Sequence, residues 1–156
     1  MKNVVQLVTF CALAGVVLSA CASPRTAPAA DERFYADVGE LEAQADLIVA
    51  GTLTEVDAAS DNAASSFVGD LDVTGTAKGS AEGDMTFRMT NASTREEDRA
   101  DLVVGRTYVL FLETFNDDTA VVLTPGQAVF DATDGRYLST NGSLTLTLEL
   151  REKLGV

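Results

Sequence analysis

The sequence predicts a mainly β protein, an antiparallel barrel or sandwich of about five to seven short strands with one or two short helices. Three observations lead to this fold class. Apolar and polar residues alternate over several short stretches, most regularly from Met85 to Thr90. Turns that contain glycine or asparagine and aspartate separate these stretches at intervals of roughly 8–15 residues. Residues 107–113 are apolar on both faces, which is typical of a central strand covered on both sides.

The individual strands follow from β-branched and apolar residues between turn signals. Five are expected at residues 47–56, 67–74, 85–90, 107–113 and 144–150, and shorter apolar segments at 121–123, 129–130 and 137–138 account for the upper end of the range. Gly51 marks a bulge or sharp bend in the first strand. The glycines of 75–83 are expected to turn the chain after the second strand, and Asp134-Gly135 predicts a hairpin.

Helical character is confined to short segments. Asp37, with Glu40 three residues later, is expected to cap a helix over residues 37–45. Residues 91–101 contain a capping-box pair, Ser93 with Glu96, and favour a short solvated helix or turn. The last segment, 143–154, alternates leucine with polar residues as a strand does, but its second half contains good helix formers, which leaves a C-terminal helix as the alternative.

The N-terminal segment has the layout of an export signal. Lys2 precedes an apolar run, small residues follow, and no acidic residue occurs before Asp31. Leu18-Ser19-Ala20-Cys21 resembles a bacterial lipobox, in which a lipid is attached to the cysteine and the chain is cut just before it. We therefore expect a signal peptide over residues 1–20, a lipidated, flexible tether over 21–33 and a single β-barrel domain over 34–156.

Two other interpretations of the N-terminal segment remain open. A transmembrane anchor needs about 20 apolar residues, whereas this run is shorter and contains Gln6 and Thr9. A secretion signal without lipid attachment would leave Cys21 free. Under the lipobox interpretation Cys11 leaves with the signal and Cys21 carries the lipid, so the domain has no cysteine for a disulfide, a thiolate metal site or a nucleophile.

Residues 45–130 carry a further resemblance. Four motifs contribute to it, namely Ala45-Asp46-Leu-Ile-Val-x-Gly51, Lys78-Gly79, Leu102-Val-Val-Gly105-Arg-x-Tyr108 with the apolar residues that follow, and Gly126-Gln-Ala-Val-Phe130. Together they resemble bacterial relatives of netrin-like and tissue-inhibitor-of-metalloproteinase domains. The resemblance implies an OB-like barrel, which needs a bent first strand and a covered central strand.

This resemblance does not extend to inhibition of proteases. The animal inhibitors chelate the zinc of their target through an N-terminal cysteine with a free amine. Lipidation would hold Cys21 at the membrane, and the tether would separate it from the domain. The disulfides typical of that group are also absent.

The composition narrows the chemistry of the domain. The 156 residues include no histidine, and 24 acidic against 11 basic residues give a net charge of −13. Without histidine the chain supplies no imidazole acid–base group, no Ser-His-Asp triad and no histidine-ligated metal. Its acidity disfavours phosphate-backbone binding. We expect no nucleic-acid partner, no cofactor and no metal.

The other candidate groups each have a structural explanation that the sequence favours. Lys78 and Ser80 are a candidate catalytic Ser–Lys pair. Both are expected in a glycine-rich turn, where solvation of the two side chains is the favoured explanation. The acid pairs that calcium would use are explained by polar strand faces and turns; these pairs are Asp70 with Asp72, Asp117 with Asp118, and Asp131 with Asp134.

Two larger sets are explained in the same way. One set of arginines is interleaved with acids, which favours internal salt pairing over an anionic-ligand patch: Arg88, Arg95, Arg99 and Arg106. Seven aromatic residues resemble the stacking platform of OB-type barrels that bind single strands, but core packing is the favoured explanation. They are Phe67, Phe87, Tyr108, Phe111, Phe115, Phe130 and Tyr137.

The sequence thus predicts a lipid-anchored, extracytoplasmic lipoprotein of the bacterial cell envelope that acts as a non-catalytic binding or interaction module. Its partners would be the membrane, through the lipid on Cys21, and a protein or envelope ligand. The alternatives are an enzyme that uses carboxylates or calcium and a passive structural lipoprotein. An exposed apolar groove would favour the binding module, whereas a cleft with two or more buried acids of raised pKa would favour the enzyme.

Overall fold

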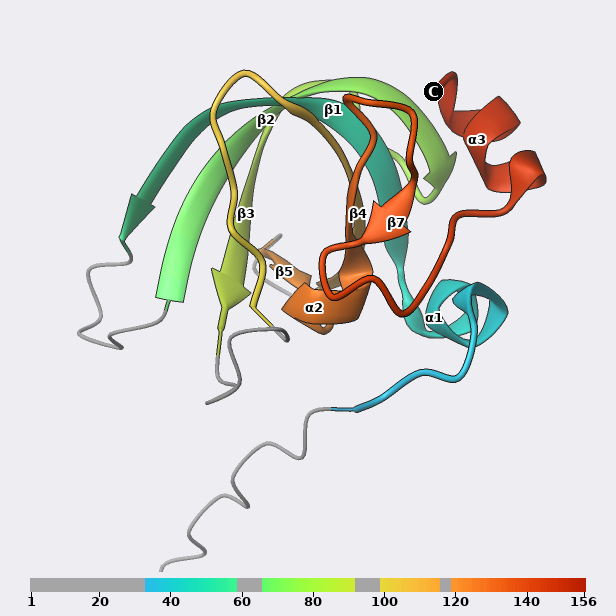
Figure 1. The fold of residues 1–156 in the computed structure, drawn as a ribbon. Helices are drawn as coiled ribbons and strands as arrows, with labels where there is room; N and C mark the ends of the chain where they lie inside the picture. Colours follow the sequence, from blue (N-terminus) through green and yellow to red (C-terminus); the bar gives the residue numbers. More distant parts are fainter. Residues whose placement is uncertain (1–32, 59–65, 92–98, 116–118) are drawn as a thin grey trace, which may run out of the picture.

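A computed structural model describes residues 33–58, 66–91, 99–115 and 119–156 (Figure 1). These residues form seven strands: β1 (Leu47–Ala58), β2 (Ser66–Lys78), β3 (Gly83–Thr90), β4 (Thr107–Thr114), β5 (Ala120–Val122), β6 (Val129–Asp131) and β7 (Leu138–Ser139). They also form three short helices: α1 (Val38–Gln44), α2 (Pro125–Ala128) and α3 (Leu148–Leu154). The predicted mainly β fold class is confirmed, with one short helix more than expected among the described residues.

Five of the strands close into a barrel. Their order is β1-β2-β3-β5-β4, and pairing of β4 with β1 completes the ring, while β6 and β7 extend from the other edge of β4. This arrangement is consistent with the OB-like barrel that was expected. All strand pairs are antiparallel except β3 with β5, which run parallel at Phe87 and Arg88. β5 is the return strand of a hairpin with β4, and this places it beside β3 in the same direction.

β1 belongs to both halves of the barrel and therefore bends sharply. Its register with β2 shifts between Ala50 and Gly51 and again between Leu53 and Glu55. A β-carbon at Gly51 would lie 2.5 Å from the carbonyl oxygen of Asp72, so the close approach of β2 requires glycine there. The bulge predicted at Gly51 is confirmed.

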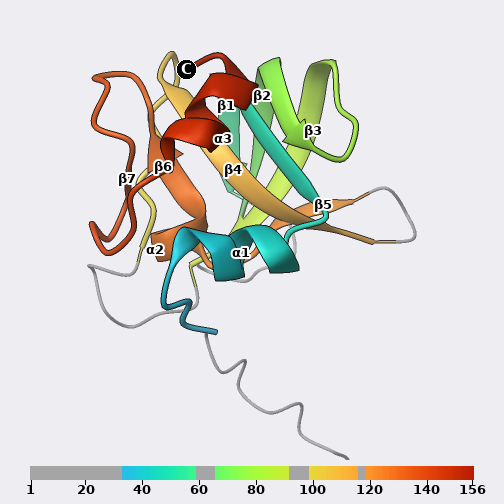
Figure 2. The same cartoon turned by 90° about the vertical axis from the view of Figure 1, so that its right-hand side faces the viewer.

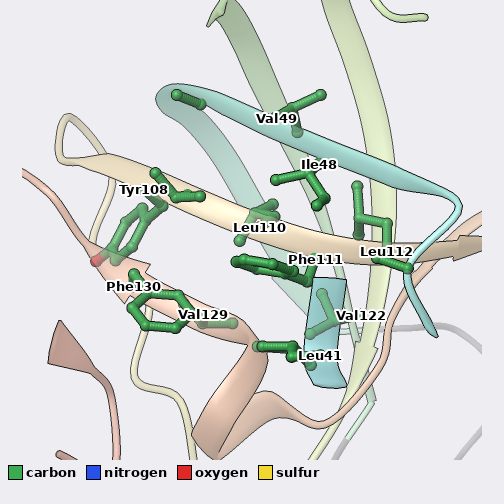
Figure 3. Close-up of a cluster of buried hydrophobic side chains, with 14 of the residues drawn as sticks. Leu41, Ile48, Val49, Tyr108, Leu110, Phe111, Leu112, Val122, Val129 and Phe130 are labelled. Atoms are coloured by element: carbon green, nitrogen blue, oxygen red, sulfur yellow. The ribbon is translucent and has the colours of Figure 1, made fainter. Parts of the chain in front are cut away.

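The core lies around β4, as the apolar character of this strand predicted. All five residues from Tyr108 to Leu112 are buried, because one face of β4 points into the barrel and α1 and α2 contact the strand from outside. The rings of Phe111 and Phe130 lie 5.5 Å apart with their planes tilted, and Leu41 of α1 packs near them (Figure 3). Burial of these large side chains is the main stabilising contribution to the fold.

The helix cap predicted at Asp37 is also present. The Asp37 carboxylate accepts a hydrogen bond of 2.8 Å from the Glu40 amide, and the Glu40 carboxylate accepts one of 3.0 Å from the Ala36 amide. Val38 and Leu41 are buried on the inner face of α1. Figure 2 shows α1 beneath one end of the barrel.

Two predictions at the element boundaries are wrong. β2 does not turn at Gly75 but continues to Lys78. The glycine at position 75 is explained by the close approach of α3, since a β-carbon there would overlap the carbonyl group of Leu154. The last segment forms helix α3 and not a strand from Leu148 onward, so the alternative interpretation is the correct one.

The reason for the C-terminal helix is a change of period in the leucines. Leu144 and Leu146 are buried at strand spacing, whereas Leu150 and Leu154 are buried at helical spacing. The Thr147 side chain accepts a hydrogen bond from the Leu150 amide and caps the helix. The strand pairing that remains in this segment is a single bridge between Leu138 and Thr145.

The predicted hairpin between β6 and β7 is confirmed by the pairing of Phe130 with Ser139. Several other predictions fall outside the described residues. These are the signal segment and lipobox within 1–32, most of the loop at 58–66, the Ser93–Glu96 capping box, and the turn at 116–118.

Candidate functional site

Residues of β1, β2 and β3, which run side by side (Figure 1), line an apolar hollow of about 210 Å³. The strands contribute Val56, Asp57, Ala58, Phe67 and Met89, and the segment before β4 contributes Ala100, Asp101 and Leu102. Met89 is buried, while Val56, Phe67 and Leu102 are half-buried and line the opening. The two ionisable groups in this lining, Asp57 and Asp101, are both acids.

Asn91 holds one wall of the hollow in place. Its side-chain oxygen accepts a hydrogen bond of 3.2 Å from the Ala100 amide, and its side-chain nitrogen donates one of 3.4 Å to the Ala100 carbonyl. Both Asn91 and Ala100 are buried, although the sequence predicted a solvated segment here. Sequence reasoning missed Asn91 because asparagine after a strand is also the ordinary residue of an exposed turn.

Tyr108 positions the turn at residues 103–106, which comes directly after the hollow-lining residue Leu102 in the chain. Its hydroxyl accepts a hydrogen bond of 2.9 Å from the Val103 amide, and Leu53 of β1 exchanges backbone hydrogen bonds with Gly105 and Arg106. Burial raises the pKa of Tyr108 by more than the Val103 hydrogen bond lowers it. The turn leaves Val103 and Val104 about half exposed, at 51% and 53%.

Two exposed valines, Val103 and Val104, lie next to the hollow in the chain. They follow Leu102 directly in the chain, and the Leu53–Gly105 hydrogen bond holds their turn against β1. Two adjacent valines in a solvent-facing turn gain nothing for the fold by exposure, and several exposed apolar residues close together are typical of binding sites. The hollow and this turn together form the apolar site, defined here by Val56, Phe67, Met89, Leu102, Val103 and Val104.

A second, polar groove of about 450 Å³ shares Asp101 with the apolar site. Charged side chains and the β6–β7 hairpin line it: Arg99, Asp101, Arg106, Asp131, Asp134, Arg136, Leu138, Ser139, Thr140 and Gly142. Arg106 forms an ion pair of 2.5 Å with Asp131, which also accepts a hydrogen bond from the Thr133 amide. The groove therefore has opposite charges that neutralise each other.

The ion pair shifts the pKa values of both Arg106 and Asp131. Burial raises the pKa of Asp131, but hydrogen bonds from Thr133 and Arg106 outweigh it and lower the pKa below its ordinary value. The hydrogen bond to Asp131 raises the pKa of Arg106. Both shifts favour the charged forms, whereas a general acid needs a carboxyl group whose pKa is raised.

The arginine set is only partly brought together. Arg99 and Arg106 line the polar groove, whereas Arg88 lies on β3 and Arg95 lies outside the described residues. Arg106 is ion-paired, but its partner comes from β6 and not from the acids near it in sequence. Arg136 is the third arginine that lines the groove. It was not among the candidates from the sequence, because nothing in its sequence surroundings distinguishes it from a solvated turn residue.

The Ser–Lys and calcium candidates have structural partners instead. The Lys78 ammonium donates a hydrogen bond of 2.7 Å to the carbonyl of Glu42 near the end of α1, and Ser80 is exposed in the following turn. Asp70 accepts a 2.6 Å hydrogen bond from the Thr86 hydroxyl. Within the described ranges no group of three or more potential ligand residues is placed to hold a metal ion, and Asp117 and Asp118 lie outside them.

Four of the seven aromatic residues lie in the core, as expected: Phe87, Tyr108, Phe111 and Phe130. The remaining three have other environments. Phe67 lines the apolar site and Phe115 is 50% exposed. The guanidinium carbon of Arg151 lies 4.7 Å from the centre of the Tyr137 ring, which links α3 to the β6–β7 hairpin.

Cys21, the site residue assigned from the sequence, lies outside the described residues. In the part of the chain that the structure describes, no helix is long and apolar enough to cross a membrane. Comparison with known proteins found no family model that matches the chain and no curated protein with significant sequence similarity to it. The apolar site is consequently the strongest structural indication of function.

Proposed function

We propose that the protein is a lipid-anchored lipoprotein of the bacterial envelope whose barrel binds a partner, without catalysis, at the apolar site. The observation that carries this proposal is the hollow of about 210 Å³, together with the exposed Val103 and Val104 that follow its lining residue Leu102 in the chain. An exposed apolar groove is the feature that separates a binding module from a passive structural lipoprotein. The lipobox pattern at Leu18-Ser19-Ala20-Cys21 supports the anchoring part of the proposal.

A carboxylate-dependent enzyme is supported less well. Such an enzyme needs a carboxyl group that stays protonated until it donates its proton, and therefore a raised pKa. In the polar groove, the pKa of Asp131 is lowered and not raised. The apolar site holds two acids at its rim, Asp57 and Asp101, and both are exposed.

Photo-crosslinking in cells tests the proposal directly. A photoreactive amino acid replaces Val103 in the full-length lipoprotein, and a matched variant carries it at Glu152, an exposed residue of α3 on the other side of the barrel (Figure 1). We expect a discrete adduct from position 103 that is absent from position 152. Equal adducts at the two positions, or none at position 103, would contradict binding at the apolar site.

A further inference from the structure

We infer that the partner is an extended, cationic polypeptide segment that pairs with the open edge of β1 and places an apolar side chain in the hollow. The inference rests on the proposed function and specifies the chemistry of the ligand. Three features of the described residues carry it: an unpaired strand edge, the coincidence of this edge with the hollow, and the sign of the surrounding charge.

The unpaired edge begins where β1 leaves β4. β1 pairs with β2 as far as Ala58, but its pairing with β4 stops at Thr52. The last backbone hydrogen bonds on that side join Leu53 to Gly105 and Arg106. Residues 54–58 have no further backbone partner on that side within the described ranges, and in Figure 1 this end of β1 forms the margin of the molecule.

A strand with one free edge is a template for another extended chain. The incoming chain gains main-chain hydrogen bonds from the edge and specificity from pockets that accept alternate side chains. Natural edges are commonly protected by charges or covered by other segments, and Glu55 and Asp57 are such charges here. These acids disfavour pairing with an acidic chain and favour pairing with a basic one.

The hollow lies beside this edge. Val56, Asp57 and Ala58 belong both to the unpaired stretch and to the lining of the hollow. Side chains of an extended ligand alternate between two faces, so every second one would be directed at the hollow. The volume of about 210 Å³ accommodates a leucine-sized group, since an apolar cavity of roughly 150 Å³ holds benzene.

The charge of the site selects the ligand. Asp57 lines the hollow, Glu55 lies on the edge strand, and the lining of the hollow contains no basic residue. Asp101, the second acid of the lining, also borders the polar groove with its arginines, so the negative charge on the edge itself comes from Glu55 and Asp57. A second copy of this chain would bring the same acids against themselves, and an anionic lipid or glycan would meet the same repulsion. A basic segment with apolar residues at alternate positions matches the edge, the hollow and the charge together.

Synthetic peptides test the inference with the full-length lipoprotein in an uncharged detergent. The probe is a fluorescein-labelled, end-capped peptide of sequence Lys-Val-Lys-Leu-Lys-Val-Lys, and binding is measured by fluorescence anisotropy. One comparison peptide has glutamate in place of every lysine. A second keeps the lysines but carries N-methyl groups on alternate peptide nitrogens, which removes its hydrogen-bond donors on the edge that would pair.

We expect the lysine peptide to bind at least about tenfold more tightly than either comparison peptide, because one lost charge-assisted or strand-pairing contact is of that order. The double variant Asp57→Asn/Asp101→Asn is expected to weaken binding about fivefold or more. The matched control Glu82→Gln/Glu152→Gln removes the same charge from exposed positions away from the hollow and should change the affinity less than twofold. Circular dichroism verifies that each variant is folded.

Three results would overturn the inference: equal binding of the glutamate peptide, equal binding of the N-methylated peptide, or an equal loss of affinity in the two double variants. The first two exclude charge selection and strand pairing, and the third indicates general attraction to an acidic protein. A discrete crosslink from position 103 in cells together with any of these results would leave the proposed function intact and refute only the chemistry of the partner. Absence of that crosslink would refute the proposed function itself.

Discussion

Single buried amides hold distant segments of this protein in place. Gln127 is 1% exposed; it accepts a 2.8 Å hydrogen bond from the Tyr35 amide and donates one of 2.9 Å to the Tyr35 carbonyl. Asn91 makes the same pair of contacts with Ala100 at the apolar site. Each of these side chains pairs with both the backbone N–H and the backbone C=O of one residue, as a neighbouring strand would. Loss of the side chain therefore leaves these buried backbone groups without partners.

Replacement of Asn91 by alanine is expected to lower the free energy of unfolding by about 1–3 kcal/mol, the usual cost of leaving buried polar groups unsatisfied. Urea denaturation measures this loss. Glu82→Gln, at an exposed turn position, is the control and should leave the midpoint unchanged. An unchanged midpoint in Asn91→Ala would show that the contact with Ala100 contributes nothing.

The Arg106–Asp131 pair predicts a defined pH dependence. The pKa of Asp131 is lowered below its ordinary value of 3.8 in the folded protein. The folded state therefore favours the ionised carboxylate, and this stabilisation is present above pH 3.8 and is lost as the pH falls through the folded pKa. The partly exposed side chains and solvent screening keep the effect small.

Asp131→Asn is accordingly expected to be less stable than the parent at pH 7, and this difference is expected to shrink as the pH falls below 3.8. Urea midpoints at a series of pH values measure the difference. Asp134→Asn, in the same groove, controls for the loss of one negative charge. A difference between Asp131→Asn and the parent that persists unchanged at pH 2 would exclude the linkage.

At the scale of elements, local sequence signals were accurate where the element depends on its own residues. The cap at Asp37, the bulge at Gly51 and the covered strand β4 all follow from local composition. The signals failed where an element is shaped by a distant one. The sequence around Gly75 indicates a turn, but Gly75 lies inside β2. Its lack of a side chain serves a distant element, since α3, more than 70 residues later in the chain, packs closely against it.

The contact between Gly75 and α3 predicts the effect of Gly75→Ala. The added methyl group overlaps the Leu154 carbonyl, and forced shifts of this kind cost about 1–3 kcal/mol. Urea denaturation and hydrogen exchange of the α3 amides measure the destabilisation and its location. In a chain shortened after Thr147 the same substitution should cost much less, as a double-mutant cycle would show. Equal costs in the two backgrounds would place the strain elsewhere.

At the scale of the whole molecule, the acidic charge and the proposed anchor act together. The net charge of −13 disfavours direct adsorption of the chain to anionic headgroups, so the proposed attachment to a membrane would depend on lipid. One acyl chain binds a bilayer weakly, whereas two or more hold stably, at roughly 0.8 kcal/mol per buried methylene group. The anchor would then keep the apolar site close to the membrane surface.

Cys21→Ala is therefore expected to release the protein from the membrane fraction. Cell fractionation followed by immunoblotting measures the distribution, and mass spectrometry of the parent protein detects the lipid on Cys21. Ser23→Ala, two residues along the chain, is the control and should remain with the membrane. A processed Cys21→Ala protein that stays in the membrane fraction as firmly as the parent would contradict lipid anchoring.

Periodicity and caps are properties of neighbouring residues, so they were enough to predict the fold class, the short helix at Asp37 and the bend at Gly51, and composition alone excluded histidine chemistry. The parallel pairing of β3 with β5, the closure of β1 onto β4 and the position of the apolar site follow from the folded chain and from no local pattern. These features join residues far apart in the chain, such as Val56 with Leu102. Their proximity depends on strand register and barrel closure, which no local pattern specifies.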